Sequence, residues 1–195
     1  MLSTQDYNPL YPIFLKAHNL QVVVIGGGFV AEEKLHFLLK SSPEANVTIV
    51  TPMIRPGTVA LAKKSSATVI EDVYNEKYIE QAHIVIATTD SPEVNKQVYH
   101  DCRKRNKLVN VADVPELCDF YMGGIVTKGN VKIAISTNGQ SPTMAKRLRQ
   151  LFEEVLPENI NDLVKNLNDY RKTLKDDFEY KVDHLNKLTE TFLQD

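Results

Sequence analysis

The chain has 195 residues, enough for one large or two small domains with a hydrophobic core. Its 43% hydrophobic and 25% charged content is that of an ordinary globular protein, and the net charge of −2 argues against general nucleic-acid binding. Two cysteines, Cys102 and Cys118, make no disulfide framework, so we expect a soluble protein of a reducing compartment, the cytoplasm. Residues 1–12 lack the pattern of a signal peptide, and no apolar run reaches the roughly 18–20 residues that span a bilayer.

Strands and helices alternate through residues 21–112. Apolar runs without polar interruption predict strands that are buried on both faces, as in a parallel sheet. Asp90-Ser91-Pro92 places a capping side chain before a proline in the first helical turn, which predicts the start of a helix. The alternation predicts a doubly wound α/β, Rossmann-like sheet. We expect a strand in the segment 21–28 that its three glycines stop, further strands at 46–50, 66–72, 83–89 and 108–112, and helices at 29–42, 55–64 and 92–106.

The pattern changes after the last of these strands. Residues 123–137 alternate in polarity around Lys128-Gly129-Asn130, which predicts a β-hairpin. Ser141-Pro142 predicts the start of a helix, which Pro157 ends. Residues 158–195 contain no Gly or Pro and carry leucines at helical spacing, which predicts one or two amphipathic helices. We expect three parts: a Rossmann-like domain at 1–113, a small β element at 114–140 and a helical domain at 141–195.

The glycine loop after the first strand indicates a ligand. Gly26, Gly28 and Ala31 fit the pattern G-x-G-x-x-A between a strand and a helix. Gly26 allows a tight turn, Gly28 lets the backbone approach a pyrophosphate, and Ala31 permits close packing. The pattern predicts dinucleotide binding, and the alternative is merely a tight strand-to-helix turn. Thr88 and Thr89 should face the same crevice, because ligands bind beyond the carboxyl ends of the strands.

The choice between NAD and NADP stays open at this stage. An acid that commonly holds the adenine ribose, about 20 residues after the glycines, is missing. The second strand ends in Thr51, Pro52 and Met53, of which Thr51 offers a hydroxyl to the ribose. No acid near this strand end would repel a 2′-phosphate, and Arg55 is placed to attract one.

A basic stretch runs between Phe120 and Phe152, where the chain has no Asp or Glu. One interpretation is a solvated helix face with a charged hairpin turn. The other is a surface for a polyanionic ligand, assisted by the helix N-terminus, with Ser136, Thr137 and Asn138 as hydrogen-bond donors. The basic residues are Lys128, Lys132, Lys146, Arg147 and Arg149.

Four segments together resemble a known family. They are VIGGGFVAEEK at 24–34, IATTDSPEVN at 86–95, VNVADVPELCDF at 109–120 and ISTNGQSPTMAKRLRQ at 135–150. In this order they resemble the precorrin-2 dehydrogenase family, the dehydrogenase and ferrochelatase part of siroheme synthase. The resemblance implies NAD-dependent oxidation of precorrin-2 to sirohydrochlorin on the route to siroheme, and some members also insert ferrous iron. It further implies a homodimer with a central dimerisation element. Longer members carry a methyltransferase domain, so we expect methylation to belong to another protein.

The resemblance also assigns site residues. The family's functional aspartate falls on Asp113, and its nucleotide-contacting pairs fall on Phe29-Val30 and Pro52-Met53. The substrate carries many carboxylates, which suits the basic stretch and makes Lys146 and Arg147 candidate ligands together with the residues of the loop before them. The histidines and cysteines show no spacing of a metal site.

Oxidation of the macrocycle transfers a hydride to the nicotinamide and releases a proton. A carboxylate at the carboxyl end of a Rossmann strand can act as the base, and Asp113 holds that position. Its alternative role is turn formation before Pro115. We expect Asp119 and Cys118 to be structural. The alternative function is a non-catalytic NAD-sensing Rossmann module that regulates a partner and would need neither Asp113 nor the basic stretch.

Overall fold

The computed structural model describes residues 7–174 and 178–190. The chain divides into two units, Met1–Gly123 and Gly124–Asp195. The predicted three-part division stays a prediction, and the portions of it at residues 1–6, 175–177 and 191–195 lie outside the described residues. No helix within the described ranges is long and apolar enough to cross a bilayer.

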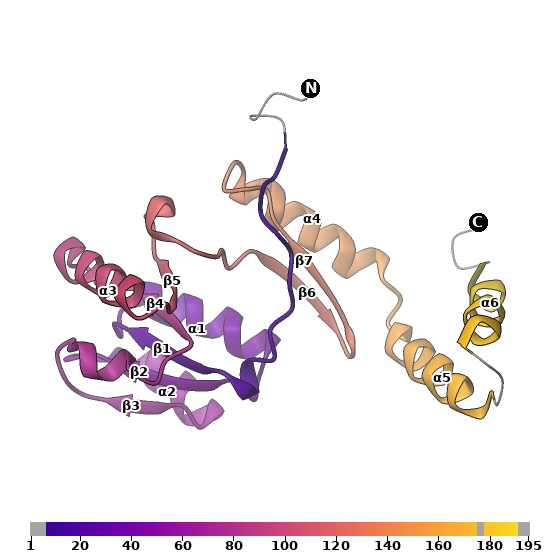
Figure 1. The fold of residues 1–195 in the computed structure, drawn as a ribbon, viewed down its shortest axis with the longest axis horizontal. Helices are drawn as coiled ribbons and strands as arrows, with labels where there is room; N and C mark the ends of the chain where they lie inside the picture. The colour runs from indigo at the N-terminus through magenta and orange to yellow at the C-terminus, as the bar shows by residue number, and fades with distance from the viewer. Residues whose placement is uncertain (1–6, 175–177, 191–195) are drawn as a thin grey trace. The chain divides into compact units, whose positions relative to one another are not determined.

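The first unit contains a five-stranded parallel sheet in the order β3-β2-β1-β4-β5 (Figure 1). Its strands are β1 (Gln21–Ile25), β2 (Asn46–Val50), β3 (Thr68–Ile70), β4 (Ile84–Ala87) and β5 (Leu108–Val111). The chain order reverses between β1 and β4, and doubly wound sheets bind ligands at such a reversal, beyond the carboxyl ends of the strands. The predicted α/β, Rossmann-like fold is confirmed.

Helices cover both faces of this sheet, which explains why the central strands are apolar on both sides. Helices α1 (Phe29–Ser41) and α2 (Pro56–Ser65) cover one face, and α3 (Pro92–Lys104) covers the other. Val24 of β1 packs in the same cluster as Leu35 of α1. Its neighbour Val23 belongs to the opposite cluster, with Val98 of α3. Full burial of each such side chain contributes about 1.5–3 kcal/mol to the stability of the fold. Because successive side chains of β1 point to opposite faces of the sheet, helices are held on both faces.

Short 3-10 helices are the main departure from the predicted elements. Each spans only three or four residues, too few for a helical periodicity to show in the sequence. The strand β1 ends at Ile25, where the glycines were expected to stop it, because Gly26 turns the chain with a φ of 116°. The three 3-10 helices are η1 (Ala17–Asn19), η2 (Glu76–Ile79) and η3 (Pro115–Leu117).

The second unit is a β-hairpin followed by helices. Its elements are β6 (Gly124–Lys128), β7 (Val131–Ile135), α4 (Pro142–Val155), α5 (Ile160–Thr173) and α6 (Phe178–Thr189). The Lys128 ammonium donates to the carbonyl oxygen of Leu156 at 2.6 Å, which caps the C-terminus of α4. The Asn161 amide oxygen accepts from the backbone N–H of Asn130 at 2.9 Å, which fixes the hairpin turn against α5.

Candidate functional site

The glycine loop between β1 and α1 is packed tightly against the end of β4. The backbone N–H of Gly26 donates to the Val50 carbonyl at 2.9 Å. A Cβ on Gly26 would lie 2.7 Å from the hydroxyl oxygen of Thr88 and 2.9 Å from its carbonyl oxygen. Thr88 in turn donates from its hydroxyl to the Ile25 carbonyl at 2.9 Å. Glycine is therefore required at position 26 by both its backbone angle and its neighbours.

Gly27 joins this loop to the segment after β2, a role that the sequence did not predict. Its carbonyl oxygen accepts from the Arg55 backbone N–H at 3.0 Å and from the Thr58 hydroxyl at 3.1 Å. A Cβ on Gly27 would lie 2.8 Å from the Met53 carbonyl oxygen. The available signal was a glycine between Gly26 and Gly28, because the pattern G-x-G does not require glycine at its middle position.

Gly28 leaves the N-terminus of α1 open. It occupies the position before the helix, where no side chain accepts from the first-turn N–H groups. A Cβ built on it would meet no atom within 4 Å. Unpaired N–H groups at a helix N-terminus bind anions such as a pyrophosphate, so this end of α1 fits a dinucleotide. Phe29 beside it is 71% exposed, whereas Ala31 is fully buried and serves the packing of helix on sheet.

The end of β2 is closed by its own hydrogen bonds. Thr51 is 3% exposed, and its hydroxyl donates to the Met53 carbonyl at 2.7 Å. Pro52 is exposed, and the Met53 side chain is 81% exposed on the surface of the same loop. Thr51 therefore shapes the loop, and its assignment to the ribose stays a prediction.

A cavity of about 250 Å³ lies at the carboxyl ends of β4 and β5. It brings Thr89 together with Asp113, although 24 positions separate them in the printed sequence. Asp113 is exposed and has a φ of 61°, a left-handed conformation that Asp adopts more readily than most residues. Asp90 and Lys96 also line this cavity. Its lining therefore combines two carboxylates, those of Asp90 and Asp113, with the ammonium group of Lys96.

Asn95 holds the wall of this cavity, and the sequence did not predict its role. It is 7% exposed on the first turn of α3. Its amide oxygen accepts from the Thr89 hydroxyl at 2.7 Å and from the Thr89 backbone N–H at 3.2 Å, and its amide nitrogen donates to the Thr89 carbonyl at 2.9 Å. The available signal was an asparagine in the first turn of a predicted helix. The residue that its side chain contacts could not be predicted, because that contact depends on the fold.

Asp119 and Cys118 have structural contacts, as expected. The Asp119 carboxylate accepts from the Val109 backbone N–H at 3.0 Å and pairs with Arg103 at 2.7 Å, so it extends the outer edge of β5. The Cys118 sulfur lies 3.2 Å from the Val111 carbonyl oxygen. Burial raises the pKa of the Cys118 thiol, which makes a thiolate nucleophile unfavourable there.

The five residues predicted to bind the substrate all belong to the second unit, on the loop after β7 and on α4. The Thr137 hydroxyl accepts from the Ser141 N–H at 3.2 Å, and the Ser136 hydroxyl oxygen accepts from the Asn138 N–H at 3.1 Å. These bonds shape the loop that precedes α4. Lys146 is exposed on α4. Arg147 lies beside it and donates to the side chain of Gln150 at 3.1 Å.

The basic stretch offers fewer available charges than the sequence indicated. Lys128 is paired with Glu158 at 2.6 Å, and its side chain is 14% exposed. Arg149 is paired with Glu153 at 2.5 Å, one helical turn away. Both acids lie outside the acid-free stretch in sequence, which is why composition alone did not reveal the pairing.

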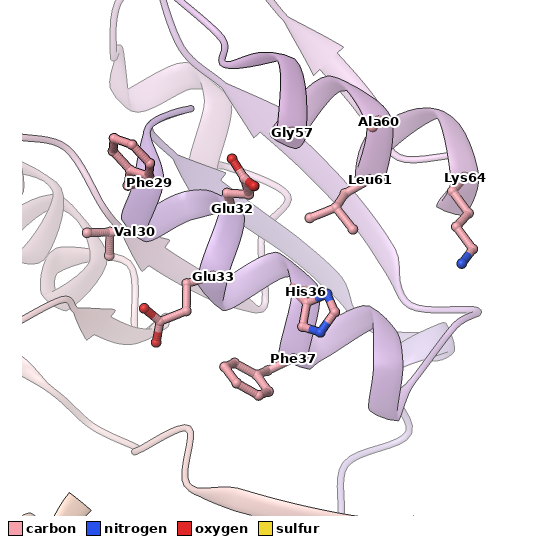
Figure 2. Close-up of a pocket in the computed structure, with 10 residues that line it drawn as sticks. All are labelled: Phe29, Val30, Glu32, Glu33, His36, Phe37, Gly57, Ala60, Leu61 and Lys64. Carbon is pink, nitrogen blue, oxygen red and sulfur yellow. The ribbon is translucent and has the colours of Figure 1, made fainter.

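A second cavity, of about 640 Å³, lies between α1 and α2 (Figure 2). It is larger than the cavity at Asp113, and its lining does not include that carboxylate or either of the threonines that follow β4, Thr88 and Thr89. It shares Phe29 and Val30 with the candidate dinucleotide site. Asp113 and Thr89 line the smaller cavity, whereas the buried Thr88 is not part of its lining.

Comparison with protein families agrees with this geometry. Residues 13–124 match the family described as "Putative NAD(P)-binding". The chain belongs to this family. Residues 128–154 match a second family, described as "Sirohaem biosynthesis protein central". The two matches follow one another along the chain in the order that the resemblance implied, and the resemblance is confirmed.

Curated relatives and a solved structure extend the match. The chain is 38% identical over 165 residues to a siroheme synthase of Psychrobacter sp. (strain PRwf-1), covering 85% of this chain and 34% of the relative. It is 36% identical over 172 residues to that of Pseudoalteromonas translucida, covering 88% and 36%. The chain thus spans about a third of the length of these relatives. The structure of "SirC, precorrin-2 dehydrogenase" matches with a TM-score of 0.73 and 22% identity, covering 92% of this chain and 89% of that one, which shows the shared fold.

Proposed function

We propose that the protein is an NAD-dependent precorrin-2 dehydrogenase that oxidises precorrin-2 to sirohydrochlorin. The observation that carries the proposal is the position of Asp113, whose cavity opens at the carboxyl ends of β4 and β5 in an NAD(P)-binding sheet. The siroheme synthase relatives and the fold shared with a precorrin-2 dehydrogenase support the same substrate. We also propose a cytoplasmic location, which the two free cysteines support.

In this proposal, different residues of the first unit bind the cofactor and remove the proton. The open N-terminus of α1 at Gly28 binds the pyrophosphate, the buried Thr88 packs against Gly26 in the glycine loop, and Thr89 lines the cavity at Asp113. NAD, when bound, supplies the acceptor for the hydride. Asp113 takes the proton that leaves the macrocycle as its conjugation extends, so that one hydride and one proton are removed together. Asn95 keeps the Thr89 backbone in place beside this carboxylate.

The second unit supplies the substrate surface in this proposal. Ser136, Thr137 and Asn138 precede the helix on which Lys146 and Arg147 lie, so donors and cations are close in sequence. We also propose a homodimer formed through the second unit. It is supported by α4, an amphipathic helix without a single buried residue.

The first test replaces Asp113 by asparagine. Asn also adopts a positive φ readily, so Asp113→Asn removes the carboxylate without straining the turn. Turnover of precorrin-2 with NAD, followed by absorbance, should fall by roughly 10²–10⁴-fold, the usual contribution of a general base. NAD binding, measured by calorimetry, should persist.

The matched control is Glu116→Gln, the same acid-to-amide change at an exposed residue of η3. It should keep wild-type turnover. Wild-type rates in Asp113→Asn would remove Asp113 from the mechanism. A wild-type protein that binds NAD but oxidises no precorrin-2 would instead favour the non-catalytic sensing module. Adding ferrous ion to the sirohydrochlorin product then tests whether the chain inserts iron.

A further inference from the structure

An ion pair joins the first turn of α1 to the N-terminus of α2. The Arg55 guanidinium lies 3.5 Å from the Glu32 carboxylate, measured from Nε to Oε2. Its central carbon lies 3.2 Å from the centroid of the Phe29 ring. Figure 2 shows the Glu32 carboxylate pointing from α1 toward the turn of α2 that contains Gly57. The carboxylate occupies the space that a Cβ on Gly57 would need, so the absence of a side chain at Gly57 makes room for it against α2.

The position of Arg55 relates this ion pair to the cofactor. Arg55 follows β2, and in dinucleotide-binding sheets the residues after the second strand contact the adenine ribose. An arginine at this place usually accommodates the 2′-phosphate of NADP, and an acid there usually binds the ribose 2′-hydroxyl of NAD. Residues 46–58 contain Arg55 and no acid. The sequence of β2 and its loop would therefore favour NADP.

The structure provides an acid from another element. Glu32 belongs to α1, and its carboxylate reaches the place after β2 where the usual acid is missing. The Nε of Arg55 is buried without a hydrogen-bond partner, and the Glu32 carboxylate, 3.5 Å away, offsets its positive charge. One face of the guanidinium is covered by Phe29. A phosphate that approached Arg55 would lie within a few ångströms of a full negative charge.

We propose that Glu32 makes the site select NAD over NADP, because it neutralises Arg55 and repels a 2′-phosphate. This inference rests on the proposed dinucleotide site and adds the residue that sets its specificity. It explains how a chain without an acid at the end of β2 uses NAD. The acid is supplied four positions after Gly28 and not about 20 positions after it.

The test measures binding and needs no turnover. Dissociation constants of NAD and NADP for the purified protein are determined by calorimetry for wild type, Glu32→Gln and Glu32→Asp. Wild type should bind NAD more tightly. Glu32→Gln should shift the ratio of the two constants toward NADP by about tenfold, the effect of removing one charge near a phosphate at the protein surface. Glu32→Asp keeps the charge and should keep the preference for NAD.

Arg55 is tested in the same background. Adding Arg55→Met to Glu32→Gln should abolish the increase in NADP affinity. The reason is that the Arg55 guanidinium, no longer paired with Glu32, is the group that attracts the 2′-phosphate. An unchanged ratio in Glu32→Gln, or a wild-type preference for NADP, would overturn the inference while leaving the dinucleotide site intact. Failure of wild type to bind either nucleotide would overturn the proposed site and this inference with it.

Discussion

At the scale of single residues, burial decides which reactive groups of the first unit can do chemistry. Cys102 is completely buried on α3, and its burial raises the pKa of the thiol to about 12. Asp113 is exposed and lines a cavity, with a left-handed backbone conformation directly after β5. The Cys102 thiol is thus inaccessible to a substrate, whereas the Asp113 carboxylate is accessible. A base-assisted oxidation requires an accessible carboxylate, and a thiol-dependent reaction at Cys102 would require an accessible thiolate.

The raised pKa of Cys102 predicts resistance to alkylation. Its thiolate is negligible at pH 8, so iodoacetamide should leave it unmodified in the folded protein and label it fully in urea. The stability that this thiol contributes is present below its unfolded pKa of about 8.5 and is lost as the pH rises toward 12. Mass spectrometry of labelled peptides provides the measurement. Rapid native labelling of Cys102 at pH 8 would contradict the buried position.

At the scale of elements, the start of α3 is tied to the end of β4 through Asn95. The three hydrogen bonds between Asn95 and Thr89 satisfy buried polar groups at the wall of the Asp113 cavity. Asn95→Ala should lower the free energy of unfolding by about 1–3 kcal/mol, because Thr89 would lose its three hydrogen bonds to the Asn95 amide. Urea denaturation checks this value.

The control for this variant lies on the same helix. Gln97→Ala changes an exposed residue of α3 and should leave the unfolding midpoint nearly unchanged. Equal stability of Asn95→Ala and wild type would show that the bonds contribute nothing to folding. A lower turnover in Asn95→Ala at unchanged NAD affinity would further indicate that Thr89 positions the reacting groups.

The contrast between Asp113 and Asn95 shows what the sequence can predict. The place of Asp113 follows from strand periodicity and a rule about strand ends, both of which are local patterns. The Asn95 contacts require β4 and α3 to be folded against each other, and the Glu32–Arg55 pair joins two helices across 22 intervening residues. The strands and long helices were therefore predictable, whereas the contacts that tune the site were not.

At the scale of the whole molecule, the second unit has too small a core for its length. Among its described residues, the buried hydrophobic side chains are Val126, Ile135 and Ile160. A unit of this size usually buries far more apolar surface, which supports the proposal that a second copy of the chain covers the rest. The exposed residues Met144, Leu151 and Val155 recur along one face of α4 at intervals of seven and four. This face is the surface through which we propose dimerisation.

Charge on this face should separate the dimer. Wild type should elute with twice the 22.1 kDa mass of one chain in size exclusion with light scattering, and Leu151→Glu/Val155→Glu should elute as a monomer. The reason is that two acids would be desolvated against apolar side chains at the contact. Gln150→Glu, which adds one acid at an exposed position on the other side of α4, should remain dimeric. Circular dichroism must show folded protein in each case. A wild-type monomer, or a dimer that survives both acids, would place the contact elsewhere or remove it.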